Sequence, residues 1–219
     1  FTENLTLKIH EGQKLKIKKI LFNGNNDFKD SKLKHLLKKN KEWKFFFPWK
    51  GKLKESELET EKLIISQFYH NKGYYDFHFT NYEIIEDFDI KGLKLIFNIY
   101  EGERYHYGKI NWIGNKEYDN EKLDNYLGFS SGDLYNKQKF LIAVYQNISA
   151  LYMDRGFFYF QIEPKIVPKQ DNILDVDFIL SENDLVTVRR IIIKGNEKTN
   201  ENVIRRELDM FPGDIFNRQ

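Results

Sequence analysis

The chain has 219 residues, of which 41% are hydrophobic and 16% aromatic, which is enough for one large domain or two to three small ones. Lys and Arg number 35 and Asp and Glu 33, and the resulting net charge of only +2 argues against a dedicated nucleic-acid-binding protein. Because the sequence contains no cysteine, disulfide bonds, thiolate catalysis and cysteine-ligated metals are excluded.

Residues 1–12 form an alternating apolar run that closes with Glu11-Gly12, and Glu101-Gly102 closes a later run in the same way. The pattern predicts that residues 1–12 are the end of a preceding module. No stretch approaches the roughly 20 apolar residues that a membrane-spanning helix needs. Since the chain opens at Phe1 without a signal-like segment, we expect a fragment or processed product whose membrane anchor lies outside it.

A long repeat organises the rest of the chain. Three alternating apolar runs end in Gly-Asn, and two further landmarks, a Gly-aromatic step and a Gly-Asp step, recur in the same order at a period of about 80 to 90 residues. The matching segments are 20–25, 110–115 and 191–196, then 72–75 and 155–158, then 129–135 and 211–216. The sequence therefore predicts modules at residues 13–102 and 103–182 and the start of another at 183–219.

The first module opens with the strand that ends at Gly24-Asn25. A long helix follows, with its predicted buried face apolar except for Glu61; this face comprises Leu58, Glu61, Ile65, Phe68 and Tyr69. In the next strand, Phe77 and Phe79 share one phase, whereas Tyr82 and Ile84 share the other. A phase slip near Thr80-Asn81 predicts either a β-bulge or an irregular edge strand.

An aromatic stretch bounded by lysines stands where the first module should connect its helices. Its members are Trp43, Phe45, Phe46, Phe47 and Trp49. The simpler interpretation is that these rings seal their own module or the seam with its neighbour. They could instead contact a partner, a client or the lipid headgroup zone, or stack on bases.

The second module has a half-buried strand through Ile110 and Trp112. A short helix over Asn120–Leu127 follows, with Asn120 as the predicted N-cap and Gly128 as its stop. A longer helix runs from about 136 to 154. Its predicted buried face comprises Leu141, Val144, Ile148, Leu151 and Tyr152.

Gly156 is expected in the left-handed conformation after this helix. Two strands follow, joined by a hairpin at Asp171-Asn172; one carries Phe158, Phe160, Ile162 and Ile166 in a single phase, and the other carries Leu174, Val176, Phe178 and Leu180. The element order is β-α-α-β-β. It predicts an α+β fold in which each module packs two helices on one face of a three-stranded mixed sheet.

The repeated order, the Gly-Asn strand end and the Gly-aromatic step together resemble POTRA domains, of the kind carried by outer-membrane protein assembly factors. Segments 188–196 and 203–208 resemble the start of the last such domain, next to the barrel, so the complete modules would be the third and fourth. The Trp-containing connection at 43–52 is similar to one in the family's third domain. The first module departs from the pattern because it lacks the Gly-Asp step before its long helix.

The resemblance implies a periplasmic arm at the outer membrane that binds unfolded outer-membrane proteins, scaffolds the lipoproteins of the assembly complex and precedes a membrane barrel absent from this chain. If the second strand is outermost, as in the family, its free edge could bind clients by strand addition. The candidate edge is Phe77, His78, Phe79, Thr80, Asn81, Tyr82, Glu83, Ile84 and Ile85. In the corresponding segment 158–166, Pro164 favours an edge merely blunted against aggregation. By resemblance, Arg205, Arg206 and Glu207 would contact a lipoprotein.

The sequence does not predict an enzyme. Its five histidines have no metal-ligand spacing, and there is no nucleophile elbow, P-loop or dinucleotide-binding glycine motif. Asp171, Asp175 and Asp177 fit a solvated turn better than a Ca²⁺ site. We therefore expect no cofactor, no metal and no nucleic-acid partner. The alternative to a client-binding arm is an architectural spacer of a secretion transporter or division complex.

Overall fold

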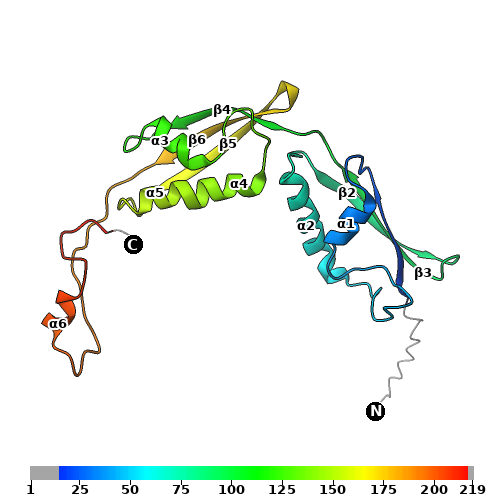
Figure 1. Cartoon of the computed structure of the whole chain (residues 1–219), viewed down its shortest axis with the longest axis horizontal. Coiled ribbons are helices and arrows are strands. Elements are labelled where there is room, and N and C mark those ends of the chain that lie inside the picture. The colour runs from blue at the N-terminus through cyan, green and yellow to red at the C-terminus, as the bar shows by residue number, and fades with distance from the viewer. Residues whose placement is uncertain (1–14, 217–219) are drawn as a thin grey trace, which may run out of the picture. The chain divides into compact units, whose positions relative to one another are not determined.

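The structure, a computed structural model, describes residues 15–216. The predicted end of a preceding module at 1–12 lies outside the described residues. The chain divides into two compact units. Within the described residues, the first unit comprises 15–69 and 76–102, and the second comprises 70–75 and 103–216. Within each unit, helices cover one face of a small sheet (Figure 1).

The first unit has the predicted order of elements. It contains β1 (Ile17–Asn23), α1 (Asp30–Leu36), a short 3₁₀ turn (Glu55–Glu57), α2 (Leu58–His70, with its last residue in the second unit), β2 (His78–Asp87) and β3 (Gly92–Tyr100). β3 lies in the middle of the sheet, parallel to β1 and antiparallel to β2. The second strand of the module is therefore outermost, as expected.

The second unit repeats this topology. It contains β4 (His106–Ile113), α3 (Asn120–Leu127), a long helical stretch, β5 (Gln161–Lys169), a short 3₁₀ turn (Gln170–Asn172) and β6 (Ile173–Ser181), with strand order β4-β6-β5. Asp171 and Asn172 both have positive φ, which is the conformation that a tight hairpin requires. The predicted α+β fold with mixed three-stranded sheets is confirmed.

The long helical stretch comprises α4 (Lys137–Ile142), a π-helical turn (Ala143–Ile148) and α5 (Ser149–Met153). The prediction that Leu141 is buried was wrong, because Leu141 is exposed and Phe140 is buried in its place. The buried residues are spaced four apart at Phe140, Val144, Ile148 and Tyr152. A π-helical turn has more residues per turn than an α-helix, so it keeps this wider spacing on one face.

Two more details differ from the predictions. The N-cap of α3 is Asp119, whose carboxylate accepts a hydrogen bond from the Lys122 backbone N–H at 2.8 Å. Asn120 instead accepts a hydrogen bond from the Asn115 side chain. Phe158 precedes β5 and is exposed, with its ring against Phe216.

The Gly-Asn motif fixes the turn after the first strand of each complete module. Gly24 and Gly114 have φ near +90°, and a Cβ on either would collide with a backbone carbonyl of the central strand. The following asparagines donate from their side chains to the carbonyls of Phe28 and Tyr118. Only glycine tolerates this combination of positive φ and close backbone approach.

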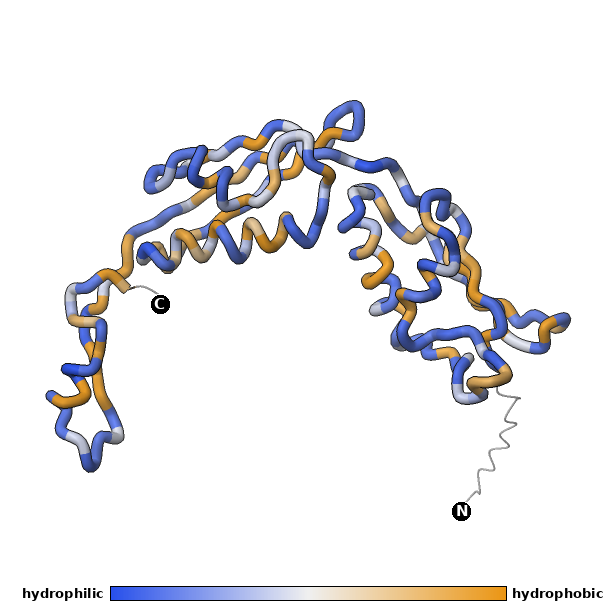
Figure 2. Tube along the Cα trace, viewed as in Figure 1, coloured by the Kyte–Doolittle hydropathy of each residue, from blue (hydrophilic) through white to orange (hydrophobic). Residues whose placement is uncertain are grey.

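The partial third module has α6 (Glu201–Arg206) but no strand over residues 191–194. Figure 2 shows this apolar run as an extended hydrophobic segment. In the complete modules the equivalent strand pairs with a later central strand, as Ile20 does with Leu95 and Ile110 with Val176. Within residues 15–216, no strand pairs with this run.

Glu61 lies on the buried face of α2 and is itself buried. Its Oε1 accepts hydrogen bonds from the backbone N–H groups of residues 38, 39 and 40 at 2.6–3.1 Å, and its Oε2 accepts one from the Asn40 side chain at 2.7 Å. The carboxylate therefore accepts the hydrogen bonds of the backbone N–H groups that follow α1. A buried carboxylate is stable only when hydrogen-bonded in this way.

Replacing Glu61 with Ala should lower the free energy of unfolding of the first unit by about 3 kcal/mol, because buried donors lose their acceptor. Urea denaturation followed by tryptophan fluorescence measures this, since Trp43 and Trp49 both lie in that unit. The matched control is Glu59→Ala, which removes only a surface ion pair with Lys62 and should cost less than about 0.5 kcal/mol. Equal effects of the two substitutions would contradict the anchoring role.

Candidate functional site

One edge of the first sheet is closed by the chain itself. The Ile17 N–H donates to the Gly51 carbonyl, and the Trp43 N–H donates to the Ile17 carbonyl, both at 2.7 Å. Further along β1, the Ile20 N–H donates to the carboxylate of Glu42 at 2.8 Å. These contacts occupy the outer side of β1, so a visiting strand could not pair there without displacing them.

The opposite edge, β2, is open. Among residues 15–216, no loop or side chain hydrogen-bonds the outward backbone groups of β2. Most of its side chains are exposed, including the apolar Tyr82 and Ile85. The predicted edge began one residue too early, because Phe77 is buried and stacks on Tyr69 with ring centroids 4.0 Å apart. It also ended too early, because β2 continues through Glu86 and Asp87.

The predicted phase slip in this strand is a β-bulge. Phe79 pairs with Ile99 and Asn81 with Asn98, so β2 has one residue more than β3 at this point. The extra residue is Thr80, whose hydroxyl donates to the Asn98 carbonyl at 3.0 Å. The bulge divides a short stretch at His78 and Phe79 from a regular stretch that begins at Asn81.

The prolines of β5 identify which backbone groups face outward. Pro164 lies opposite Phe178 and Pro168 opposite Leu174. Since proline has no N–H to give to the central strand, these two positions face the free edge. Phe97 and Leu93 of β3 correspond to Phe178 and Leu174 of β6. The residues opposite them in β2 are Tyr82 and Glu86. The open edge of β2 therefore keeps two outward N–H groups that β5 lacks.

Acidic side chains lie along the same edge. Glu83 and Glu86 are exposed, and Asp87 contacts Lys94 with an oxygen-to-nitrogen distance of 2.7 Å. The hydrogen bond from Lys94 holds the pKa of the Asp87 carboxyl below its ordinary value, so this group stays ionised at neutral pH. Charges along an edge strand oppose pairing between identical edges. Any strand added at this edge would be favoured by neutral or basic residues opposite these carboxylates.

The predicted aromatic loop divides into an inner and an outer part. Trp43 is half-buried: its backbone packs against Gly51, and the Lys18 ammonium lies 3.5 Å from the centre of its ring. Phe45, Phe46 and Trp49 are exposed by 79%, 84% and 71%. The interpretation that the loop seals its own module therefore holds for Trp43 and not for these three rings.

The residues expected at a lipoprotein contact do not behave alike. Arg205 holds α6 in place, donating to Glu201 at 2.8 Å and to the Ile191 carbonyl at 3.0 Å. Arg206 and Glu207 have largely exposed side chains. They form a surface ion pair with each other at 3.7 Å. Of the three expected residues, these two could contact another molecule without disturbing α6.

Between residues 15 and 216, no group of three or more His, Asp or Glu side chains is placed to hold a metal ion. No helix in this range has the length and apolar character needed to cross a bilayer. The candidate sites among the described residues are the open edge of β2, the exposed rings of the aromatic loop, and Arg206 with Glu207.

Comparison with known proteins gives relatives over nearly the whole chain. It is 29% identical over 218 residues to outer membrane protein assembly factor BamA of Nitratidesulfovibrio vulgaris, and 28% identical over 211 residues to BamA of Neisseria meningitidis serogroup B. These alignments cover 97% and 94% of this chain but 27% and 26% of the relatives. The chain therefore spans about a quarter of their length.

Solved structures match the fold. The crystal structure of POTRA domains 3–5 of Haemophilus influenzae BamA has a TM-score of 0.64 at 20% identity, covering 93% of this chain and 80% of that one. BamA from Haemophilus ducreyi lacking POTRA domains 1–3 has a TM-score of 0.57 at 14% identity, covering 78% of this chain and 30% of that one.

The family model described as "POTRA: Surface antigen variable number repeat" matches three segments, at residues 15–102, 105–183 and 186–219. Together with the repeated β-α-α-β-β units, these matches show that the chain belongs to the POTRA family.

Proposed function

We propose that the chain is part of a periplasmic arm of an outer-membrane protein assembly machine, and that β2 binds extended segments of unfolded β-barrel proteins by strand addition. The observation that carries the proposal is the difference between the edges of the first sheet: β1 is closed by its own chain, and β2 is open. The named function of the BamA relatives, outer membrane protein assembly, supplies the class of client.

Strand addition suits a receptor of many clients because main-chain hydrogen bonds carry no sequence information. In β2 the outward N–H groups belong to Tyr82, Ile84 and Glu86, which lie opposite Phe97, Leu95 and Leu93. The carbonyl groups of the same residues also face outward, so the edge offers about six hydrogen bonds of about 0.5–1.5 kcal/mol net each. The freedom that a peptide loses on binding offsets much of this total, so binding is weak and reversible. Such binding fits a client that must be passed on.

An architectural spacer is the competing function. POTRA membership fits both alternatives, since a fold does not by itself define a function. The two alternatives differ in whether the β2 edge binds extended peptides. The first experiment is therefore a titration of the isotope-labelled chain with an unfolded peptide that has the sequence of a barrel strand. Chemical-shift changes concentrated along β2 support the client-binding arm.

We predict that Tyr82→Pro with Glu86→Pro weakens this peptide binding by at least about tenfold, because two outward donors are removed. The pair copies into the first unit the prolines that β5 carries at positions 164 and 168. The matched control is Tyr82→Ser with Glu86→Ser, which removes the same side chains and keeps both N–H groups. Equal affinity of the two double variants, or shift changes away from β2, would leave the spacer as the better function.

The proposal extends to lipoproteins of the assembly complex and to attachment through a membrane barrel. Arg206 and Glu207 are the exposed residues of the third module proposed for the lipoprotein contact. Exchanging their charges, by Arg206→Glu and Glu207→Arg, should reduce retention of a partner lipoprotein in a pull-down severalfold, since complementary charge sets specificity. The far-ultraviolet circular dichroism should not change. Undiminished retention would remove these residues from the interface.

A further inference from the structure

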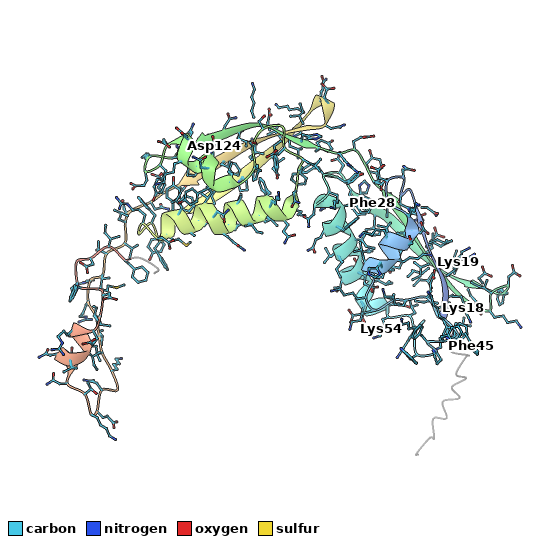
Figure 3. The ribbon with its side chains drawn as sticks, in the orientation of Figure 1. Lys18, Lys19, Phe28, Phe45, Lys54 and Asp124 are labelled. Atoms are coloured by element: carbon cyan, nitrogen blue, oxygen red, sulfur yellow. The ribbon has the colours of Figure 1, made fainter. Side chains whose placement is uncertain are left out.

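The aromatic loop spans residues 43–50. Its outer rings, Phe45, Phe46 and Trp49, form an apolar surface that the first unit does not cover. The exposed rings contact one another: Phe45 lies edge-to-face with Phe46, and Phe47 with Trp49, at centroid distances of 5.7 and 5.5 Å. Figure 3 places Phe45 at the end of the first unit where β1 begins. Large apolar side chains gathered at one exposed point mark an interaction site.

The loop stands on a fixed base. The Asn40 side chain forms two hydrogen bonds with the backbone of Lys54, accepting from its N–H at 2.8 Å and donating to its carbonyl at 3.1 Å. Asn40 is in turn held by Glu61. The two bonds between Ile17 and the loop backbone fix it to β1. The rings are therefore displayed by a rigid frame and cannot fold back into the core without breaking it.

The surface around the rings is basic. Residues 38–54 contain seven lysines and one glutamate, and that glutamate, Glu42, already pairs with Lys34 at 2.9 Å. Beside the loop is an open groove of about 700 Å³, whose charged lining residues are four lysines and two acids: Lys34, Lys41, Lys44, Lys50, Asp30 and Glu42. The occupant of this site must therefore offer apolar material to the tip and negative charge to the rim.

Elsewhere in the chain, one loop position of each module covers a glycine. In the second unit Leu134 covers Gly73, and Ile215 covers Gly156 in the same way. The bond from Ile17 to Gly51 matches those from Tyr107 to Asp133 and from Val188 to Asp214. Lys52, which follows Gly51, therefore stands at the position of Leu134 and Ile215, and it is exposed and charged. The aromatic rings at 45, 46 and 49 come before this position.

We propose that the aromatic loop inserts into the interfacial layer of a bilayer that contains anionic phospholipid. Phenylalanine and tryptophan rings partition into the headgroup and upper acyl region. Lysines at the surface gain from a negative leaflet within a Debye length. A projecting tip with a basic rim fits a flat, deformable anionic surface. The proposal does not depend on client binding by β2.

The test is flotation of the whole chain with vesicles of phosphatidylethanolamine and phosphatidylglycerol in equal amounts, with vesicles of phosphatidylcholine alone as the neutral comparison. We expect binding to the anionic vesicles that weakens with salt, and quenching of tryptophan fluorescence by lipids brominated on their acyl chains. Trp49→Phe should abolish most of the quenching, because Trp112 is buried and Trp43 is half-buried.

Phe45→Ser with Phe46→Ser should lower vesicle partitioning at least about tenfold, since two rings lose their apolar contact. The matched control is Phe88→Ser with Ile90→Ser, which removes two exposed apolar side chains from the turn between β2 and β3 and should leave partitioning unchanged. Equal loss in both double variants, or no flotation of the parent chain, would overturn the proposal. So would quenching of Trp49 by poly-glutamate or single-stranded DNA without vesicle binding, because the loop would then bind another polymer.

Discussion

The position of the third strand of each module, in the middle of its sheet, determines the rest of the structure. It pairs in parallel with the first strand and antiparallel with the second, which leaves the second strand at an edge. The central strand also fixes the turn after the first strand of each complete module, because a Cβ on Gly24 or Gly114 would collide with one of its backbone carbonyls.

The repeated features were predictable from sequence because each has a local cause. Gly-Asn after a strand and the Asp171-Asn172 hairpin reflect positive-φ backbone conformations that few residue types adopt. The β-bulge at Thr80 was visible as a change of phase in the alternating apolar residues. Predictions failed where the cause was not local. Leu141 lost its place in the core to Phe140 because a π-helical turn changes the spacing, and no residue type signals that turn. Asp119 took the N-cap from Asn120, a difference of one residue between two equally suitable side chains.

The candidate site was predictable only in part for the same reason. The alternation of 77–85 located the edge strand, but not the closure of the opposite edge, which depends on Glu42 and on the loop backbone at 43 and 51. Glu61 was visible as the one charged residue on an apolar helix face. Its role could not be deduced, because its partners at 38–40 come from a segment without regular structure. The exposure of Phe45 and Phe46 ran against the simpler expectation for aromatic residues.

The two complete modules share a frame and differ at a few positions, and these differences separate structural from functional residues. Residues present in both, such as the Gly-Asn turns and the buried alternation of the central strands, are required by the sheet. Residues present in only one module are not required by the sheet. The prolines at 164 and 168 remove outward donors from β5, whereas the inserted loop at 43–51 adds exposed aromatic rings beside β1. Closure of the first strand is common to both modules, because Tyr107 bonds to the backbone of residues 132 and 133 as Ile17 does to that of residues 43 and 51. Both changes act at edges and surfaces and leave the core pairing intact. One frame can therefore carry an open edge in the first module and a blunted edge in the second, because edge chemistry is independent of the buried register that holds each sheet together.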